Sequence, residues 1–310
     1  MISNDHGSSC GIFGDDEFLR TTTGLIDRVI RSGVKKTSWA LTPTEPWTWQ
    51  GIVIFEVVLC AISLFVHVVG SMAPQLVLTI PKNGFSVGSG TLLILAGSLL
   101  PAALLVTWSQ ECRAALIRFD ANWGIYVAAL LIGIFLPVSG YIGSEHSYPV
   151  WDSGSVTRFV RVFVLNLVLS PLWEEIIWRA YFYQRLKSMF RTRQAILVGA
   201  TGWTIWHVGY LFYLSRYGIK ERVLAILTLQ IFLAGVIACC LFTLSRRGLG
   251  TCVLFHGAFN ASTAIYYGAY GRVSDTGSYI GETTVMLTVA AVLIRTLIRR
   301  ERRVAGTTIV

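Results

Sequence analysis

Charged residues are scarce in this chain. Asp, Glu, Lys and Arg make up only 14% of the 310 residues, whereas 54% are hydrophobic. Soluble domains usually contain about 25% charged residues. The deficit argues against a soluble protein and predicts an integral membrane protein. Because most of the length is needed for membrane segments, no second large soluble domain is expected.

Several sequence signals of other protein classes are missing. The six cysteines show neither metal-ligand nor disulfide spacing, so we predict no metal cluster and no disulfide framework. The first residues are polar and acidic, and we expect no cleavable signal peptide. The net charge is +9, but the basic residues cluster at the ends of apolar runs. This placement indicates contact with membrane lipids and not with nucleic acid.

Eight apolar runs of about 20 residues are long enough to cross a bilayer. They lie near residues 51–72, 86–108, 122–143, 158–185, 195–214, 222–243, 249–270 and 279–298. The sequence therefore predicts an all-α, polytopic membrane protein of about eight transmembrane helices with an intramembrane polar cavity. In a bacterium this is an inner or plasma membrane protein.

The Lys/Arg bias of the short loops predicts the orientation. With eight spans, most basic loops and the C-terminal RTLIRRERR segment fall on one side, so both termini are expected in the cytoplasm. The loop after the fifth run is an exception, with Arg216, Lys220 and Arg222 on the opposite side.

The chain is predicted to have three parts. Residues 1–46 form a cytoplasmic tail, residues 47–304 form the transmembrane domain with its polar motifs within 170–262, and residues 305–310 form a short C-terminal tail. In the first tail, apolar residues between Phe18 and Ile30 lie near one helical face, which suits an interfacial helix on an anionic leaflet. A partly ordered polar tail is the alternative.

Two adjacent carboxylates, Glu174 and Glu175, lie inside an apolar stretch, with Arg179 one helical turn later. A charge at membrane depth costs about 2.5–3.5 kcal/mol, so such residues face the protein interior. Arg179 shares a helix face with Glu175 and can neutralise it. Glu174 lies about 100° around the axis and is left for chemistry. Pro171 is expected to restart the helix just before this pair.

Two further polar pairs occur at a four-residue step in later apolar runs: Trp203/His207 and His256/Asn260. Tertiary packing could bring both histidines to Glu174. Glu174 and His207 would then activate a water molecule, while His256 and Asn260 would stabilise the oxyanion of peptide hydrolysis. Another histidine, His67 in the first run, is expected to be a structural hydrogen bonder, as most lone membrane histidines are.

The segments EEIIWR, WTIWH and HGAFN resemble the three motifs of the CAAX protease and bacteriocin-processing family of intramembrane proteases, which read EExxxR, (F/W)xxxH and HxxxN. They occur in the same order on separate apolar segments, so the resemblance covers the second half of the chain. The resemblance implies that Glu174 is the general base and that His207 lies beside it. It implies that His256 and Asn260 form the oxyanion site, with Glu175 and Arg179 as supporting residues. Trp203 stands where many members have Phe.

The resemblance implies a glutamic-type endopeptidase that cleaves a membrane-anchored or lipid-proximal peptide or protein. Family substrates include prenylated CAAX tails, bacteriocin leaders and sorting-signal proteins, and the sequence does not choose among them. No cofactor is expected, because the chain has no HExxH motif and Asn260 is a poor zinc ligand. Two histidines and a glutamate are nevertheless a conceivable zinc ligand set, and that alternative stays open.

Two non-proteolytic functions would use the same buried residues. The first is a transporter or bacteriocin-immunity protein, since intramembrane Glu and His residues also serve proton relays. Transporters are commonly built from inverted repeats with matching broken helices, and no such repeat is found in this chain. The second is a scaffold that has lost its chemistry, but every motif position is filled here.

Overall fold

A computed structural model describes residues 48–72, 78–79, 86–87, 89–118, 122–142, 153–216, 219–269 and 276–307. The proposed interfacial helix at Phe18–Ile30 and the domain boundary near residue 46 lie outside these residues. The described chain is helical apart from one antiparallel pair, β1 (Leu78–Thr79) and β2 (Ser86–Val87). The predicted all-α class is confirmed.

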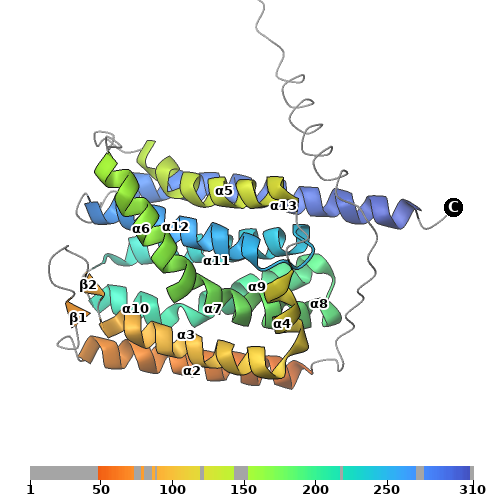
Figure 1. The fold of residues 1–310 in the computed structure, drawn as a ribbon, viewed down its shortest axis with the longest axis horizontal. Coiled ribbons are helices and arrows are strands. Elements are labelled where there is room, and N and C mark those ends of the chain that lie inside the picture. The colour runs from red at the N-terminus through yellow and green to blue at the C-terminus, as the bar shows by residue number, and fades with distance from the viewer. Residues whose placement is uncertain are drawn as a thin grey trace, which may run out of the picture. The chain divides into compact units, whose positions relative to one another are not determined.

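Figure 1 shows the helices in chain order. They are α2 (Trp49–Met72), α3 (Ser89–Trp108), α4 (Gln110–Ile117), α5 (Trp123–Ile142), α6 (Ser153–Leu169), α7 (Pro171–Glu175), η1 (Ile176–Tyr183), α8 (Gln184–Met189), α9 (Thr192–Trp206), α10 (Val208–Arg216), α11 (Glu221–Leu244), α12 (Gly250–Ala269) and α13 (Thr276–Thr307). Helix α13 continues past residue 304, where the sequence placed the start of the C-terminal tail.

Five helical segments of the described chain are long and apolar enough to cross a membrane. They are Trp49–Val69, Trp123–Gly140, Thr192–Ser215, Glu221–Leu244 and Thr276–Arg303. The protein is thus an integral membrane protein. All eight predicted runs overlap helices, but the count of eight spans stays a prediction, because helix α6, for example, has only 17 residues.

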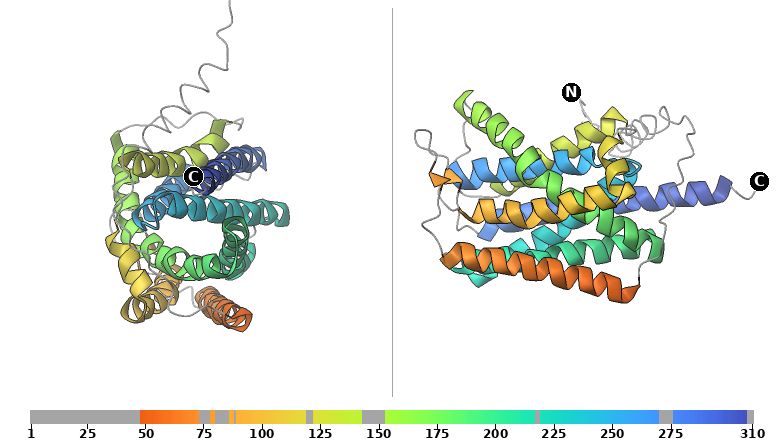
Figure 2. Two further views of the ribbon diagram at one scale, coloured as in Figure 1. Left: turned by 90° about the vertical axis from the view of Figure 1, so that its right-hand side faces the viewer. Right: turned by 60° about the horizontal axis from the view of Figure 1, so that its bottom comes forward.

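The long helices run side by side, as the two further views make clear (Figure 2). Helix α2 packs on α3 and α10, α9 packs on α11, α11 on α13, α13 on α5, α5 on α12, and α12 on α6. The short helix α7 lies against α3, α6 and α12. The carboxylate pair at the end of α7 is therefore surrounded by other helices and not by lipid.

Helices α5 and α12 approach each other closely at Gly133. A Cβ atom there would collide with the carbonyl oxygen of Phe255 and lie 2.8 Å from the Cβ of Ala258. Small residues allow such close helix contacts in membranes, where packing drives helix association. Because Phe255 directly precedes His256, this crossing also fixes the part of α12 that carries the second histidine motif.

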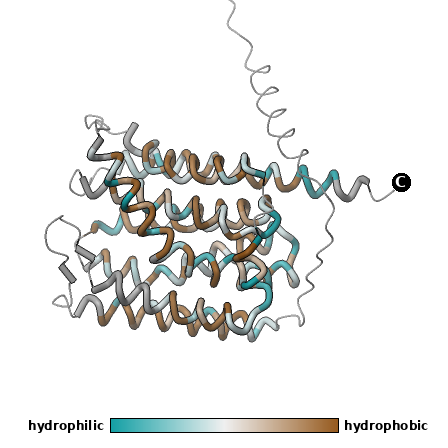
Figure 3. The backbone as a smooth tube through the Cα atoms, in the orientation of Figure 1, coloured by the Kyte–Doolittle hydropathy of each residue, from teal (hydrophilic) through white to brown (hydrophobic). Residues whose placement is uncertain are grey.

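Basic residues from loops far apart in sequence gather at one end of the bundle. Arg118 donates to the carbonyl oxygen of Arg246 (3.1 Å), Arg247 donates to Gln184 Oε1 (3.4 Å), and Arg300 donates to the carbonyl oxygen of Leu244 (3.2 Å). Hydrophilic residues accordingly colour this end in Figure 3, around α4, α8 and the last coloured turns of α13.

This clustering supports a topology prediction. A reporter fused after Val310 should lie in the cytoplasm, and one inserted between residues 144 and 152 should lie on the opposite side of the membrane. The positive-inside rule is the physical reason. A pair of enzymatic reporters, one active only in the cytoplasm and one only outside, measures both positions. Finding the two insertions on the same side would contradict the predicted topology.

Candidate active site

A proline begins the segment that carries the carboxylate pair. Pro171 is the first residue of α7, a position that tolerates the missing N–H, so the predicted helix restart is confirmed. Directly after Glu175 the backbone continues as a π-helix, η1. π-helical turns are rare and frequently occur at functional sites. The sequence pattern did not predict this one.

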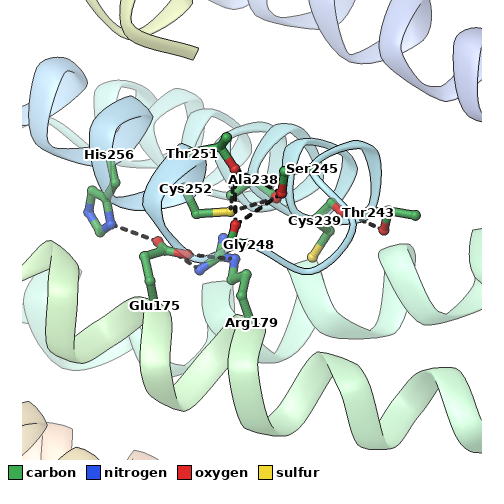
Figure 4. A network of polar contacts seen from close by, with 10 residues as sticks. All are labelled: Glu175, Arg179, Ala238, Cys239, Thr243, Ser245, Gly248, Thr251, Cys252 and His256. Carbon is green, nitrogen blue, oxygen red and sulfur yellow. Dashed lines mark hydrogen bonds and ion pairs between the residues drawn. The ribbon is translucent and has the colours of Figure 1, made fainter. Parts of the chain in front are cut away.

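Glu175 lies between two cationic partners and is fully buried. Arg179 contacts both of its carboxylate oxygens at 3.2 Å, so the predicted ion pair is confirmed. On the other side, His256 Nδ1 donates to Glu175 Oε1 at 2.9 Å (Figure 4). Arg179 also stacks on the ring of Trp203, at 4.5 Å from its centre. The second carboxylate therefore orients His256 as well as pairing with Arg179.

Hydrogen bonds at the start of α12 hold His256 in place (Figure 4). Cys252 Sγ donates to the carbonyl oxygen of Ala238 on α11 (3.3 Å), and the Thr251 hydroxyl donates to the carbonyl oxygen of Gly248 (3.2 Å). The five cysteines that the structure describes are all free. Here Cys252 acts as a small buried residue that joins α12 to α11.

Glu174 has one carboxylate oxygen bound and one free. Its side chain is buried, and Oε1 accepts a hydrogen bond of 2.5 Å from the Ser170 hydroxyl. Oε2 is buried without a hydrogen-bond partner among the described residues, and the indole N–H of Trp203, likewise without a partner, lies near this carboxylate. His207 and His256 are both close enough to interact electrostatically with Glu174. The free oxygen is thus available to a water molecule.

His207 owes its orientation to a break between α9 and α10. The backbone N–H of His207 bonds to Thr204 and not to Trp203, four residues back. The Trp203 carbonyl oxygen instead accepts the imidazole Nδ1–H at 2.7 Å. A carbonyl oxygen can only accept, so Nδ1 carries the proton and Nε2 of the neutral ring has a lone pair. The segment WTIWHVGYL contains no proline, and its glycine, Gly209, lies two residues after the interruption, so the sequence pattern did not predict it.

One cavity of about 540 Å³ brings the sequence-predicted residues together. Its walls include Glu174, His207, His256 and Asn260, the four residues expected to be catalytic, and the supporting residues Glu175 and Trp203. Arg179, the remaining supporting residue, lies behind Glu175. The half-buried Asn260 follows His256 by one helical turn on the same wall.

Other polar residues line this cavity that the motif spacing did not single out. They are Ser63, His67, Asn166, Ser170, Tyr210, Gln230, Thr263, Tyr279 and Glu282. For Ser170 a signal existed, because it precedes Glu174 by four residues, the same step that links the recognised pairs. The others are single polar residues in apolar runs, which most often only pack.

Within the described residues, no group of three or more His, Cys, Asp or Glu side chains is arranged to hold a metal ion. His207 and His256 each use Nδ1 in a hydrogen bond to the protein, which leaves Nε2 as the ring nitrogen that could bind a metal. That the reaction needs no metal remains a prediction.

The fold and the cavity define a class: polytopic membrane proteins with a buried Glu–His–Asn site between their helices. Residues 156–262, which contain all three motifs, match the family model of the type II CAAX prenyl endopeptidase Rce1-like proteins. The chain is also 28% identical over 174 residues to CAAX prenyl protease 2 of Methanococcus maripaludis, a match that covers 54% of this chain and 61% of that protein. These findings confirm the resemblance carried by the motifs and support the CAAX protease and bacteriocin-processing family.

Proposed function

We propose that the protein is a CAAX-type intramembrane endopeptidase that cleaves a membrane-anchored or lipid-proximal peptide with a water molecule activated by Glu174 and His207. The observation that carries the proposal is the free Oε2 of buried Glu174 in a cavity shared with His207. Both groups present acceptors, and a water molecule between them can donate to each. Membrane lipids and the membrane-associated substrate are the partners that such a site needs.

The chain's own residues can carry the proton through the reaction. Glu174 takes a proton from the water as its oxygen bonds to the peptide carbonyl carbon, while His207 Nε2 accepts the second O–H and orients the attack. The carbonyl oxygen becomes an oxyanion. When the C–N bond breaks, Glu174 returns its proton to the leaving nitrogen, which departs as an amine.

Glu175 has a distinct role in this proposal. Its bond to Nδ1 of His256 leaves Nε2 as the free ring nitrogen, and Nε2 is a donor only when the ring is protonated. His256 Nε2–H and the Asn260 amide can then donate to the oxyanion.

A reconstituted assay tests the function. Purified protein in liposomes that also contain a farnesylated CAAX-type peptide should release a shortened peptide, which mass spectrometry detects. This substrate comes first because the matched relative is named a CAAX prenyl protease. Adding EDTA or 1,10-phenanthroline should leave the rate unchanged, because the proposed mechanism uses no metal.

Two results would count against this proposal. If no membrane-anchored peptide is cleaved, including peptides with the sequences of bacteriocin leaders and sorting signals, the protein is not a peptidase of this kind. If chelators abolish cleavage and added zinc restores it, Glu174 would be the base of a metal-bound water instead. The same peptide without its lipid anchor is the control, and we expect it to be cleaved more slowly.

A further inference from the structure

A third histidine reaches the cavity from outside the segment that matches the family model. His67 lies on α2, whereas the matched segment covers residues 156–262. Its side chain is only 5% exposed and lines the same cavity as Glu174 and His207. Glu174 and His207 are both close enough to interact with it electrostatically. His67 therefore belongs spatially to the site and not only to the packing of α2.

One ring nitrogen of His67 is committed and the other is open. Nδ1 bonds to the carbonyl oxygen of Ser63 at 2.7 Å. Because a carbonyl oxygen only accepts, Nδ1 must carry the proton, and Nε2 of the neutral ring is an acceptor. Nε2 is buried and has no hydrogen-bond partner among the described residues. A buried polar atom is normally paired, so its partner has to come from the cavity.

The surroundings hold the ring in this orientation. The Ser63 hydroxyl donates to the carbonyl oxygen of Trp206 (2.7 Å) and so joins α2 to the junction of α9 and α10, next to His207. The ring packs edge-on against Tyr210, with centres 6.2 Å apart. At Gly209 a Cβ atom would lie only 3.0 Å from His67 Nδ1, so the absence of a side chain there makes room for the imidazole.

We propose that His67 is a substrate-binding residue of this site, whose Nε2 accepts a hydrogen bond from a main-chain N–H of the peptide substrate. The inference rests on the proposed function, because it needs a peptide in the cavity. A peptide presents an N–H group at nearly every residue, and an acceptor with a fixed direction selects one of them. His67 thereby sets where the chain lies relative to Glu174 and the water.

Two substitutions separate this role from a structural one. In His67→Asn, the amide N–H can replace Nδ1–H as donor to Ser63, but nothing replaces Nε2. In His67→Gln, a polar atom lies near the position of Nε2, but the bond to Ser63 is lost. We expect His67→Asn to raise KM about three- to tenfold, the worth of one hydrogen bond, with kcat and melting temperature nearly unchanged. His67→Gln should recover part of the KM and lower the melting temperature.

A purely structural His67 would give the opposite pattern. His67→Asn would then behave like the parent, and His67→Gln would be unstable without any specific change in KM. Thr228→Ala is the control, because the Thr228 hydroxyl donates to the carbonyl oxygen of Leu224 on α11 and Thr228 does not line the cavity. It should leave KM unchanged.

The decisive measurement uses peptides in which one amide at a time is replaced by an ester, which removes a single N–H. Binding is measured to the Glu174→Gln protein, which should hold the peptide without cleaving it. One ester position should weaken binding when His67 is present, and the same ester should have no effect when His67 is Asn. If no ester position weakens binding to the protein with native His67, the inference is overturned, and this outcome does not depend on whether the His67→Asn protein folds. The inference is also overturned if every sensitive position is equally sensitive in the His67→Asn protein. A parent protein that cleaves no peptide would defeat the proposed function itself.

Discussion

Replacing Glu174 by Gln is expected to reduce peptide cleavage by about 10²–10⁴-fold, the usual worth of general-base catalysis. Gln keeps the size of the side chain, and its Oε1 can still accept the hydrogen bond from Ser170. It cannot take a proton from water. The measurement is kcat/KM of the purified variant in liposomes, together with its melting temperature, which should stay close to that of the parent.

The matched control for this variant is Glu221→Gln. Glu221 lies at the exposed start of α11, outside the three motifs, and is not among the cavity-lining residues. Its replacement should leave kcat/KM unchanged. If Glu174→Gln cleaves at the parental rate, the assignment of the base is wrong, and a proton-relay or transport function for the buried carboxylates becomes the better interpretation.

Arg179→Ala is expected to destabilise the protein strongly. Removing one partner of a buried ion pair costs about 3–5 kcal/mol, since the remaining charge is left without compensation. We expect the lower half of that range, because His256 still donates to Glu175. The stacking of the guanidinium on Trp203 is lost as well. The yield of folded protein and its melting temperature in detergent measure the effect.

Arg185→Ala provides the comparison within the same segment. Arg185 also forms an ion pair, with Glu111 at 3.1 Å, but both side chains are partly exposed. Ion pairs near solvent are worth about 0–1 kcal/mol, so this variant should be close to the parent in stability. An Arg179→Ala protein as stable as Arg185→Ala would show that the Glu175–Arg179 pair does not support the fold.

The amino-acid sequence alone determined the membrane class, the apolar runs and three polar pairs at a four-residue step. These features are local: a bilayer requires long apolar segments, and residues four apart on a helix share a face. Glu175 and Arg179 therefore pair as the spacing predicted. The lack of an ion-pair partner for Glu174 on its own helix follows the same logic, since the residue four positions later is Trp178.

Only the tertiary structure decided how the helices share their polar groups. It placed His256 beside Glu175, because α12 packs on α7, and residue spacing within one helix does not determine how two helices pack. It interrupted the helix at His207, so that the imidazole N–H of His207 donates to the Trp203 carbonyl oxygen in place of the main-chain N–H. It also brought His67, which the sequence assigned to packing, into the cavity from a helix more than 100 residues earlier in the chain. Contacts between distant helices depend on how whole helix surfaces pack, and the spacing of residues within one helix does not determine that packing.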